Sequence, residues 1–214
     1  MWLVVGLGNP GNKYARNRHN VGFRAVELLA SRHGLGELRA GGKLGGATAS
    51  GVITTPRGRQ KVVLLEPMEF MNLSGFALQR AATFYGVDLA ETVVLHDEID
   101  LDFGTVRLKQ GGGHGGHNGL RSIVEQCAGA NFARIRIGVG KPGPVPGAAD
   151  GGNPRAKAGD KDVAGWVLAD FPTAQAAIVD AMLARAADAV EAIVGLGVGP
   201  AMNDFNGKSS LVPA

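Results

Sequence analysis

Cysteine, net charge and long apolar runs are all scarce in this sequence. Cys127 is the only cysteine among 214 residues, so the chain can form neither an internal disulfide nor a cysteine-based zinc site, which suits a reducing cytosol. No apolar stretch reaches the roughly 18–20 residues that span a bilayer, and the N-terminus lacks the basic region and cleavage site of a signal peptide. We therefore expect a cytoplasmic protein that is neither secreted nor embedded in a membrane.

The composition favours a single core with many turns. Hydrophobic residues make up 45% of the chain, and 34 glycines with 10 prolines argue against a helical bundle. Lys and Arg number 22 against 19 Asp and Glu, which gives a net charge of +3. This slight basic excess permits a polyanionic partner but does not require one.

Short apolar runs alternate with segments of helical period along the chain. The runs have the length of buried strands, and two of the helical segments end at Gly34 and Gly86, the residue type that favours a left-handed helix cap. This alternation predicts an α/β sandwich formed by one domain that spans residues 1–214. The predicted strands are residues 2–5, 62–65, 93–95 and 135–139, and the predicted helices are residues 21–33, 76–85, 120–127 and about 173–194.

One long segment shows neither period. Residues 142–161 contain nine Gly or Pro in twenty positions and almost no large apolar side chain, so burial there would not offset the entropy cost of ordering the chain. We expect a mobile loop at 142–161 within the single domain.

Three short motifs point to other chemistries, and each is incomplete. GLGNPG at residues 6–11 matches the dinucleotide-binding pattern, but no helical segment starts directly behind it and no acidic residue ends a second strand. GKS at residues 207–209 lacks the first glycine of a phosphate-binding loop, because Met202 stands there. His114 and His117 have a spacing suited to a metal, yet no carboxylate with a recognisable ligand spacing accompanies them.

Polar residues gather behind the predicted strands. Asn9 follows the first strand, the segment 66–72 follows the second and Asp97 follows the third. If these strands are parallel neighbours, their carboxyl ends share one edge of the sheet, where open α/β proteins bind ligands. His19 and Asn118, from the starts of two helical segments, would reach the same cleft.

One imidazole and one carboxylate in such a cleft suggest a general-base pair. A neutral His19 can take a proton from water, and an ionised Asp97 would fix its tautomer and stabilise the imidazolium. Asparagine amides supply donors and acceptors without net charge, which suits holding an ester carbonyl and orienting water. Taken singly, Asn9 is also a common turn residue and Asn118 a common helix start.

Five motifs read together resemble the bacterial peptidyl-tRNA hydrolase family. They follow the family's order and extend over nearly the whole chain, and MNDFN at residues 202–206 resembles the family's ending. The five motifs are GLGNPGNKYARNRHNVGF (6–23), FMNLSG (70–75), HDEID (96–100), GGGHGGHNGLRS (111–122) and FARIRIGVGKPG (132–143).

This resemblance implies a monomeric cytoplasmic enzyme built as a three-layer sandwich, with a mixed, twisted central sheet flanked by helices. Such an enzyme hydrolyses the ester bond of peptidyl-tRNA released prematurely from ribosomes, which frees the peptide and recycles the tRNA, and it uses no metal or other cofactor. By the family's motifs, His19 is the general base and Asp97 is the carboxylate that keeps it basic. Asn9 is the residue that discriminates between blocked and unblocked aminoacyl groups.

The family's motifs also assign substrate contacts. Positions that contact the substrate are matched by Tyr14, Phe70, Met71, Asn72 and Asn118, with Met71 lining the peptide channel. The tRNA must be held by its phosphates, which calls for Arg and Lys at the cleft mouth. Lys109 and Arg136 match basic positions associated with the acceptor stem and the CCA end, and Arg107 is a third basic candidate.

The chain departs from the family's pattern at three positions. Asn17 stands where the family usually has Thr, Glu66 where it has Lys, and Glu69 where it has Thr. A glutamate that faces the tRNA would weaken phosphate binding, whereas one paired with Arg or Lys would have a slight effect. Three rival functions also stay open: a non-catalytic RNA-binding module, a nucleotide-dependent oxidoreductase that uses the glycines of residues 6–11, and a His-metal hydrolase.

Overall fold

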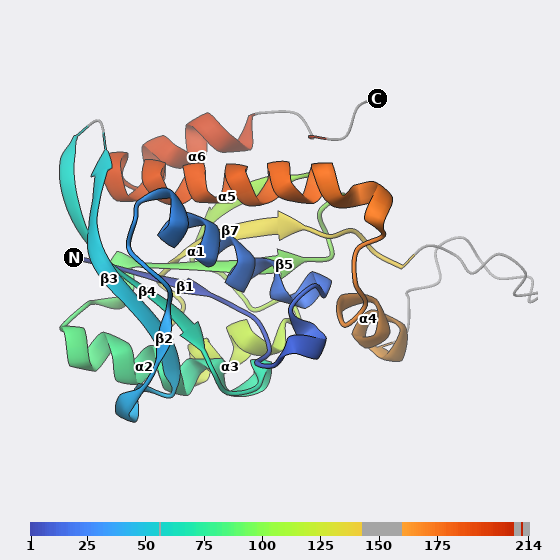
Figure 1. The fold of residues 1–214 in the computed structure, drawn as a ribbon, viewed down its shortest axis with the longest axis horizontal. Helices are drawn as coiled ribbons and strands as arrows, with labels where there is room; N and C mark the ends of the chain where they lie inside the picture. Colours follow the sequence, from blue (N-terminus) through green and yellow to red (C-terminus); the bar gives the residue numbers. More distant parts are fainter. Residues whose placement is uncertain (56, 143–159, 208–210, 212–214) are drawn as a thin grey trace, which may run out of the picture.

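The computed structural model describes residues 1–55, 57–142, 160–207 and 211 (Figure 1). The described residues form one seven-stranded sheet with the order β2-β3-β4-β1-β5-β7-β6. The four central strands run parallel: β4 (Gly58–Pro67), β1 (Trp2–Gly6), β5 (Thr92–Glu98) and β7 (Ala133–Gly138). The outer strands β3 (Gly46–Thr55), β2 (Arg39–Ala40) and β6 (Val106–Gln110) pair antiparallel with their neighbours. The expected mixed sheet is therefore confirmed.

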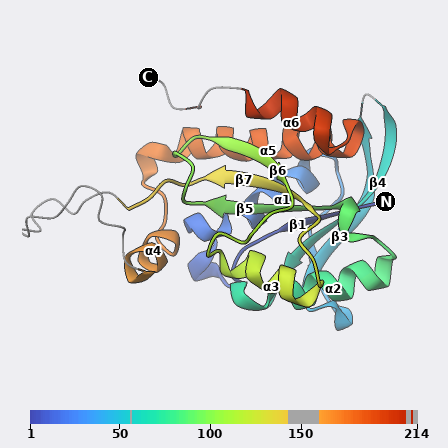
Figure 2. The same cartoon turned by 180° about the vertical axis from the view of Figure 1, so that it is seen from behind.

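Helices cover both faces of this sheet (Figures 1 and 2). One face carries α1 (Val21–Arg32), α5 (Ala176–Leu196) and α6 (Val198–Asn206), and the other carries α2 (Ser74–Tyr85) and α3 (Asn118–Gln126). Successive side chains of a strand point to opposite faces, so Val4 joins the core under α1 and α5 while Leu3 and Val5 join the core over α2 and α3. The expected three-layer sandwich is confirmed.

The four predicted strands lie within β1, β4, β5 and β7, or one residue beyond the end of β7, and the first three are parallel neighbours. Asp97 is the last residue but one of β5, so it lies within that strand and does not follow it. Residues 143–159 of the predicted loop lie outside the described residues. The last two residues of the predicted loop, 160 and 161, are helical and belong to α4 (Asp160–Val167).

Gly6 of the GLGNPG motif and Gly22 of α1 serve the contact between α1 and β1. A Cβ atom on Gly6 would lie 2.3 Å from the carbonyl oxygen of Gly22, and a Cβ atom on Gly22 would lie 2.4 Å from the backbone nitrogen of Leu7. Both distances are far below van der Waals contact, so only glycine lets the helix lie directly on the strand. This packing gives a structural reason for Gly6 and fixes the start of α1 beside the carboxyl end of β1.

The C-terminal motif covers the edge of β6. The Asn206 side chain accepts a hydrogen bond from the backbone nitrogen of Leu108 at 2.8 Å and donates one to its carbonyl oxygen at 2.9 Å. Arg107, a residue considered above for tRNA binding, donates to the backbone oxygen of Asn206 at 2.6 Å. The Asn206 side chain thus bonds to the open edge of β6 in the way that the backbone of a further strand would. Within the described parts of the chain, the helices lack the combined length and apolar character needed to cross a bilayer.

Candidate active site

The carboxyl ends of β1 and β5 open into a cleft of about 700 Å³. Its lining also comes from the turn η2 (Arg18–Asn20) before α1, the turn η4 (Met71–Leu73) before α2, the start of α3, and α4. Of the site residues predicted from sequence, the cleft is lined by Asn9, Tyr14, His19, Phe70, Met71, Asn72, Asp97 and Asn118. Lys109 and Arg136 do not line it.

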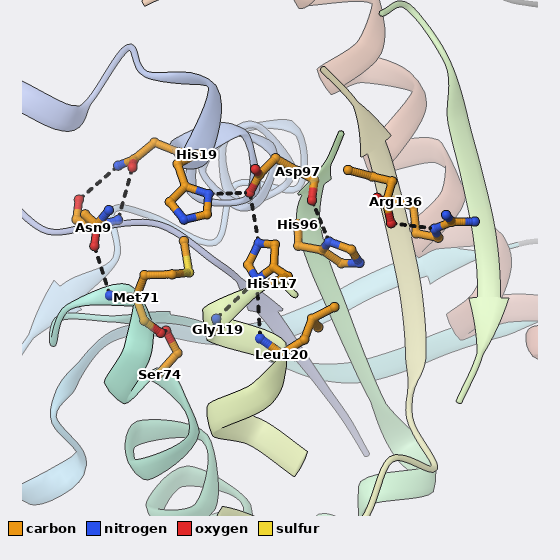
Figure 3. Close-up of polar contacts among 12 residues, drawn as sticks. Asn9, His19, Met71, Ser74, His96, Asp97, His117, Gly119, Leu120 and Arg136 are labelled. Atoms are coloured by element: carbon orange, nitrogen blue, oxygen red, sulfur yellow. Dashed lines mark hydrogen bonds and ion pairs between the residues drawn. The ribbon is translucent and has the colours of Figure 1, made fainter. Parts of the chain in front are cut away.

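His19 and Asp97 form a close pair at the base of the cleft (Figure 3). His19 Nδ1 lies 2.7 Å from Asp97 Oδ1. Burial disfavours the charged imidazolium, but the neighbouring carboxylate outweighs it and raises the pKa of His19 above its ordinary value. Burial likewise opposes ionisation of Asp97, yet His19 and His117 hold the pKa of that carboxyl well below its usual range. Asp97 is therefore the anionic partner, and Nε2 of His19 is left as the basic atom.

His117 shares the same carboxylate oxygen, a contact that was not predicted from the sequence. Its Nε2 lies 3.0 Å from Asp97 Oδ1, while its Nδ1 accepts hydrogen bonds from the backbone nitrogens of Gly119 and Leu120 at 3.1 and 3.3 Å (Figure 3). Because Nδ1 accepts, the ring proton is on Nε2 and is donated to Asp97. One residue thus caps the start of α3 and orients the carboxylate beneath His19.

His96 supports this arrangement from below. Its ring lies edge-on to His117, with 5.1 Å between the ring centroids, and its Nδ1 donates to the backbone oxygen of Asp97 at 2.7 Å. Complete burial lowers the pKa of His96 to about 3, so this ring is neutral whenever the protein is folded near neutral pH. It adds a fixed donor to the site without adding charge.

Asn9 is held rigidly at the opposite wall. Its Oδ1 accepts the backbone N–H of Met71 at 2.9 Å (Figure 3). Asn20, which the sequence analysis also missed, brackets the Asn9 backbone by accepting its N–H at 3.0 Å and donating to its carbonyl oxygen at 2.9 Å. These bonds fix the direction of the Asn9 amide, since its oxygen faces Met71 and its Nδ2 donor is the other end. Such a donor at the cleft wall suits binding of a carbonyl group.

Comparison with known proteins decides the family of this chain. The model of the family described as peptidyl-tRNA hydrolase matches residues 3–212. The chain belongs to the peptidyl-tRNA hydrolase family. It is 44% identical to the peptidyl-tRNA hydrolase of Chloroflexus aggregans over 96% of this chain and 99% of that one, and 44% identical to that of Mycobacterium ulcerans over 94% and 95%. The crystal structure of peptidyl-tRNA hydrolase from Acinetobacter baumannii superposes with a TM-score of 0.83 at 39% identity, covering 98% of this chain and 96% of that one.

The two basic residues matched to the family's tRNA-binding positions lie outside the cleft lining, at different heights along β6 and β7. Arg136 Nε donates to Glu98 Oε2 at 3.0 Å, and Glu98 lines the cleft. Lys109 is exposed on β6, and a Cβ atom on Gly112 would lie 2.8 Å from its Cε, so its stem runs along the glycine-rich loop. Arg136 is thus joined to the cleft through Glu98, whereas Lys109 lies opposite Arg134, near the start of β7 and away from the strand ends that open into the cleft.

The two glutamates that depart from the family's pattern have different surroundings. Glu69 pairs with Arg80 at 2.9 Å. Its charge is therefore compensated, and we expect it to have only a slight effect on phosphate binding. Glu66 is 6% exposed on β4, and its Oε1 has no hydrogen-bond partner among the described residues. Its burial, more than its charge, is what distinguishes this position.

His19, Asp97 and His117 are also the set of side chains that could hold a metal ion in the described part of the chain, with ligand atoms within 4.8 Å of one another. His19 Nδ1 and His117 Nε2 are both hydrogen-bonded to Asp97 Oδ1. The other nitrogen of His117, Nδ1, accepts a hydrogen bond from the α3 backbone. His114, the other histidine of the suspected metal pair, accepts the N–H of Gly116 through Nδ1 at 3.1 Å. Hydrogen bonding accounts for this cluster without a metal.

Proposed function

We propose that this protein hydrolyses the ester bond of peptidyl-tRNA and of other N-blocked aminoacyl-tRNAs, which releases free tRNA and peptide. The observation that carries the proposal is the His19–Asp97 pair at the base of a cleft lined by amide side chains. Membership of the peptidyl-tRNA hydrolase family supports the same substrate. The reaction is an acyl transfer to water, for which a positioned base and fixed donors suffice.

In this mechanism, Nε2 of His19 accepts a proton from water as the water oxygen attacks the ester carbonyl carbon. The imidazolium that forms is stabilised by Asp97, 2.7 Å from Nδ1. The tetrahedral intermediate then collapses, the ester C–O bond breaks, and the imidazolium returns the proton to the departing ribose oxygen. His117 has a positioning role, because its donated N–H fixes the Asp97 oxygen that orients His19.

We assign discrimination between blocked and unblocked substrates to Asn9. A blocked aminoacyl group presents an amide carbonyl where an unblocked one presents an ammonium group. The Nδ2 donor of Asn9, fixed by the bond between its oxygen and Met71, can bind the carbonyl but offers nothing to a cation. An ammonium group would therefore lose hydration without compensation.

The remaining matched residues would hold the substrate on either side of the ester. Tyr14, Phe70, Met71, Asn72 and Asn118 are proposed to contact the peptide and the CCA end, because all of them line the cleft. Lys109 and Arg136 are proposed to bind phosphates of the acceptor stem, a contact that weakens with salt. We further propose that the enzyme acts in the cytoplasm and that it is a monomer. Sedimentation of the purified protein with and without tRNA would test the oligomeric state.

The test is release of the acyl group from N-acetylated aminoacyl-tRNA, with unblocked aminoacyl-tRNA as control and with each reaction run both with and without a chelator. We expect cleavage of the blocked substrate alone. His19→Ala should lower kcat by about 10²–10⁴-fold with little change in tRNA binding, and Arg136→Ala should mainly weaken binding. His33→Ala, which removes an imidazole paired with Glu191 on α5, is the matched control and should leave kcat unchanged. Binding of tRNA without cleavage by the wild type would favour the RNA-binding module, and loss of activity with chelator would favour a metal enzyme.

A further inference from the structure

Helix α4 forms the wall of the cleft farthest from the sheet. Figures 1 and 2 both show it beyond the ends of the strands, outside the two helix layers. Four of its residues or near neighbours line the cleft, and they are Val163, Ala164, Val167 and Leu168. These apolar residues belong to neither core cluster. The placement of this wall therefore depends on contacts other than core packing.

Arg18 provides the central contact. It is 4% exposed, and its Nη1 donates to the backbone oxygens of Trp166, Ala169 and Asp170 at 3.3, 3.1 and 3.1 Å. Its guanidinium carbon also lies 3.8 Å from the centre of the Trp166 ring. A cation is favoured at the carboxyl end of a helix, where the last carbonyl groups lack partners, and a desolvated cation–aromatic contact adds to this.

The residues beside Arg18 strengthen the same junction. Asn17 Nδ2 donates to Asp170 Oδ1 at 2.7 Å, and the backbone N–H of Arg18 donates to the oxygen of Ala169 at 3.1 Å. Trp166 is held on its far side by a hydrogen bond from Nε1 to the oxygen of Gly140 at 2.9 Å. Asn17, one of the positions that depart from the family's pattern, thus has a specific partner at the end of α4.

We infer that Arg18 is a positioning residue that holds α4 as the apolar wall of the cleft, and that this wall sets the affinity for the peptide part of the substrate. The inference rests on the proposed function. Adjacent residues divide the work: Arg18 holds α4, while His19 is held separately by Asp97. Loss of the anchor should therefore impair peptide binding while the general base stays in place, and apolar peptides should be affected most.

The kinetic test compares two substrates, a tRNA carrying one N-acetylated residue and a tRNA carrying an N-acetylated apolar tetrapeptide. In Arg18→Lys and Trp166→Ala we expect KM for the longer substrate to rise about tenfold while kcat and the KM of the shorter one stay within about twofold. Lysine keeps the charge but loses the planar contact and the forked donors. Trp166→Phe, which keeps a ring for Arg18, should restore KM most of the way to the wild-type value.

Arg32→Lys is the matched control, because Arg32 also joins two helices, pairing with Asp188 and Glu191 of α5 far from the cleft. It should change neither KM nor kcat. A fall in kcat in Arg18→Lys with KM unchanged would overturn the inference, since Arg18 would then act on His19. Equal rises in KM for both substrates would also overturn it, because the wall would not distinguish the peptide.

A second measurement tests the anchor without any hydrolysis. The chain has two tryptophans, so a Trp2→Phe background leaves the fluorescence of Trp166 as the reporter. Acrylamide should quench Trp166 about twofold more strongly when Arg18→Lys is added, and Arg32→Lys should leave quenching unchanged. Unchanged quenching in Arg18→Lys would refute the anchor. If the wild type cleaves no substrate, the proposed function fails, while this quenching result still decides whether Arg18 holds α4.

Discussion

Glu66→Gln should stabilise the protein, and the gain should grow as the pH rises. Glu66 is 6% exposed on β4, where the family's pattern has a lysine, and its Oε1 has no hydrogen-bond partner among the described residues. Burial, reinforced by the charge of Glu27 on α1, raises the pKa of Glu66 to about 8 from its ordinary 4.5. The folded chain therefore keeps this carboxyl protonated near neutral pH.

The magnitude follows from the difference between the two pKa values. Between pH 4.5 and about 8 the folded chain binds a proton that the unfolded chain releases, so the free energy of unfolding falls with rising pH across this window. Each pH unit within this window lowers the free energy of unfolding by about 1.4 kcal/mol. The total loss is roughly 3 kcal/mol at about pH 7 and roughly 5 kcal/mol above about pH 8. Glutamine has a similar shape and does not titrate, so the variant avoids this loss.

Urea denaturation of both proteins at about pH 5 and about pH 8 measures the effect. The free energy of unfolding of Glu66→Gln should exceed that of the wild type by under about 1 kcal/mol at the lower pH and by roughly 4 kcal/mol at the higher. Glu69→Gln, which removes the half-buried ion pair with Arg80, is the control and should change stability by at most about 1 kcal/mol. A gap that is the same at both pH values, or a less stable variant, would refute the reasoning.

Two further predictions concern the base and the packing beneath it. Asp97→Asn should lower kcat and move the acid limb of the pH profile of kcat/KM to lower pH, because the carboxylate is what raises the pKa of His19; profiles of both proteins on blocked aminoacyl-tRNA check this, and an unmoved limb contradicts it. Gly22→Ala should lower the free energy of unfolding by about 1–3 kcal/mol or more, because the new Cβ would lie 2.4 Å from the backbone of Leu7. Thermal melting compares it with Gly199→Ala on α6, where the new Cβ meets nothing within 4 Å and no loss is expected; equal melting points in the two variants would contradict the packing argument.

The strands that could be predicted from sequence are those buried on both faces. Such strands appear as continuous apolar runs, as in β1, β4, β5 and β7. β6 was missed because it alternates Val106 and Leu108 with charged residues that are partly or fully exposed. β3 was missed because its ten residues are largely small or hydroxylated, with only part of them buried. The helix α6 was noticed only as a motif, since it is only nine residues long and has Gly199 and Pro200 near its start.

The site could be predicted where residues stand at or just behind the carboxyl ends of strands that turned out to be neighbours, as with Asn9 behind β1 and Asp97 near the end of β5. His117, Asn20 and Arg18 could not be assigned, because each has its partner in another segment and only the folded chain shows that partner. One local signal was available for His117. A histidine directly before the first residue of a helix can accept backbone N–H groups through Nδ1, as asparagine and serine do at that position.

The side-chain cover over β6 has a consequence for how the protein behaves in concentrated solution. An open edge strand invites pairing with another chain and leads to aggregation. At β6, however, the backbone of Leu108 is already bonded to Asn206, and a charged lysine stands next to it at position 109. A chain cut before residue 206 would keep every residue of the cleft but lose this cover. We therefore expect the MNDFN motif to protect the protein from aggregation. Its loss should reduce the amount of protein that stays soluble more than it reduces kcat.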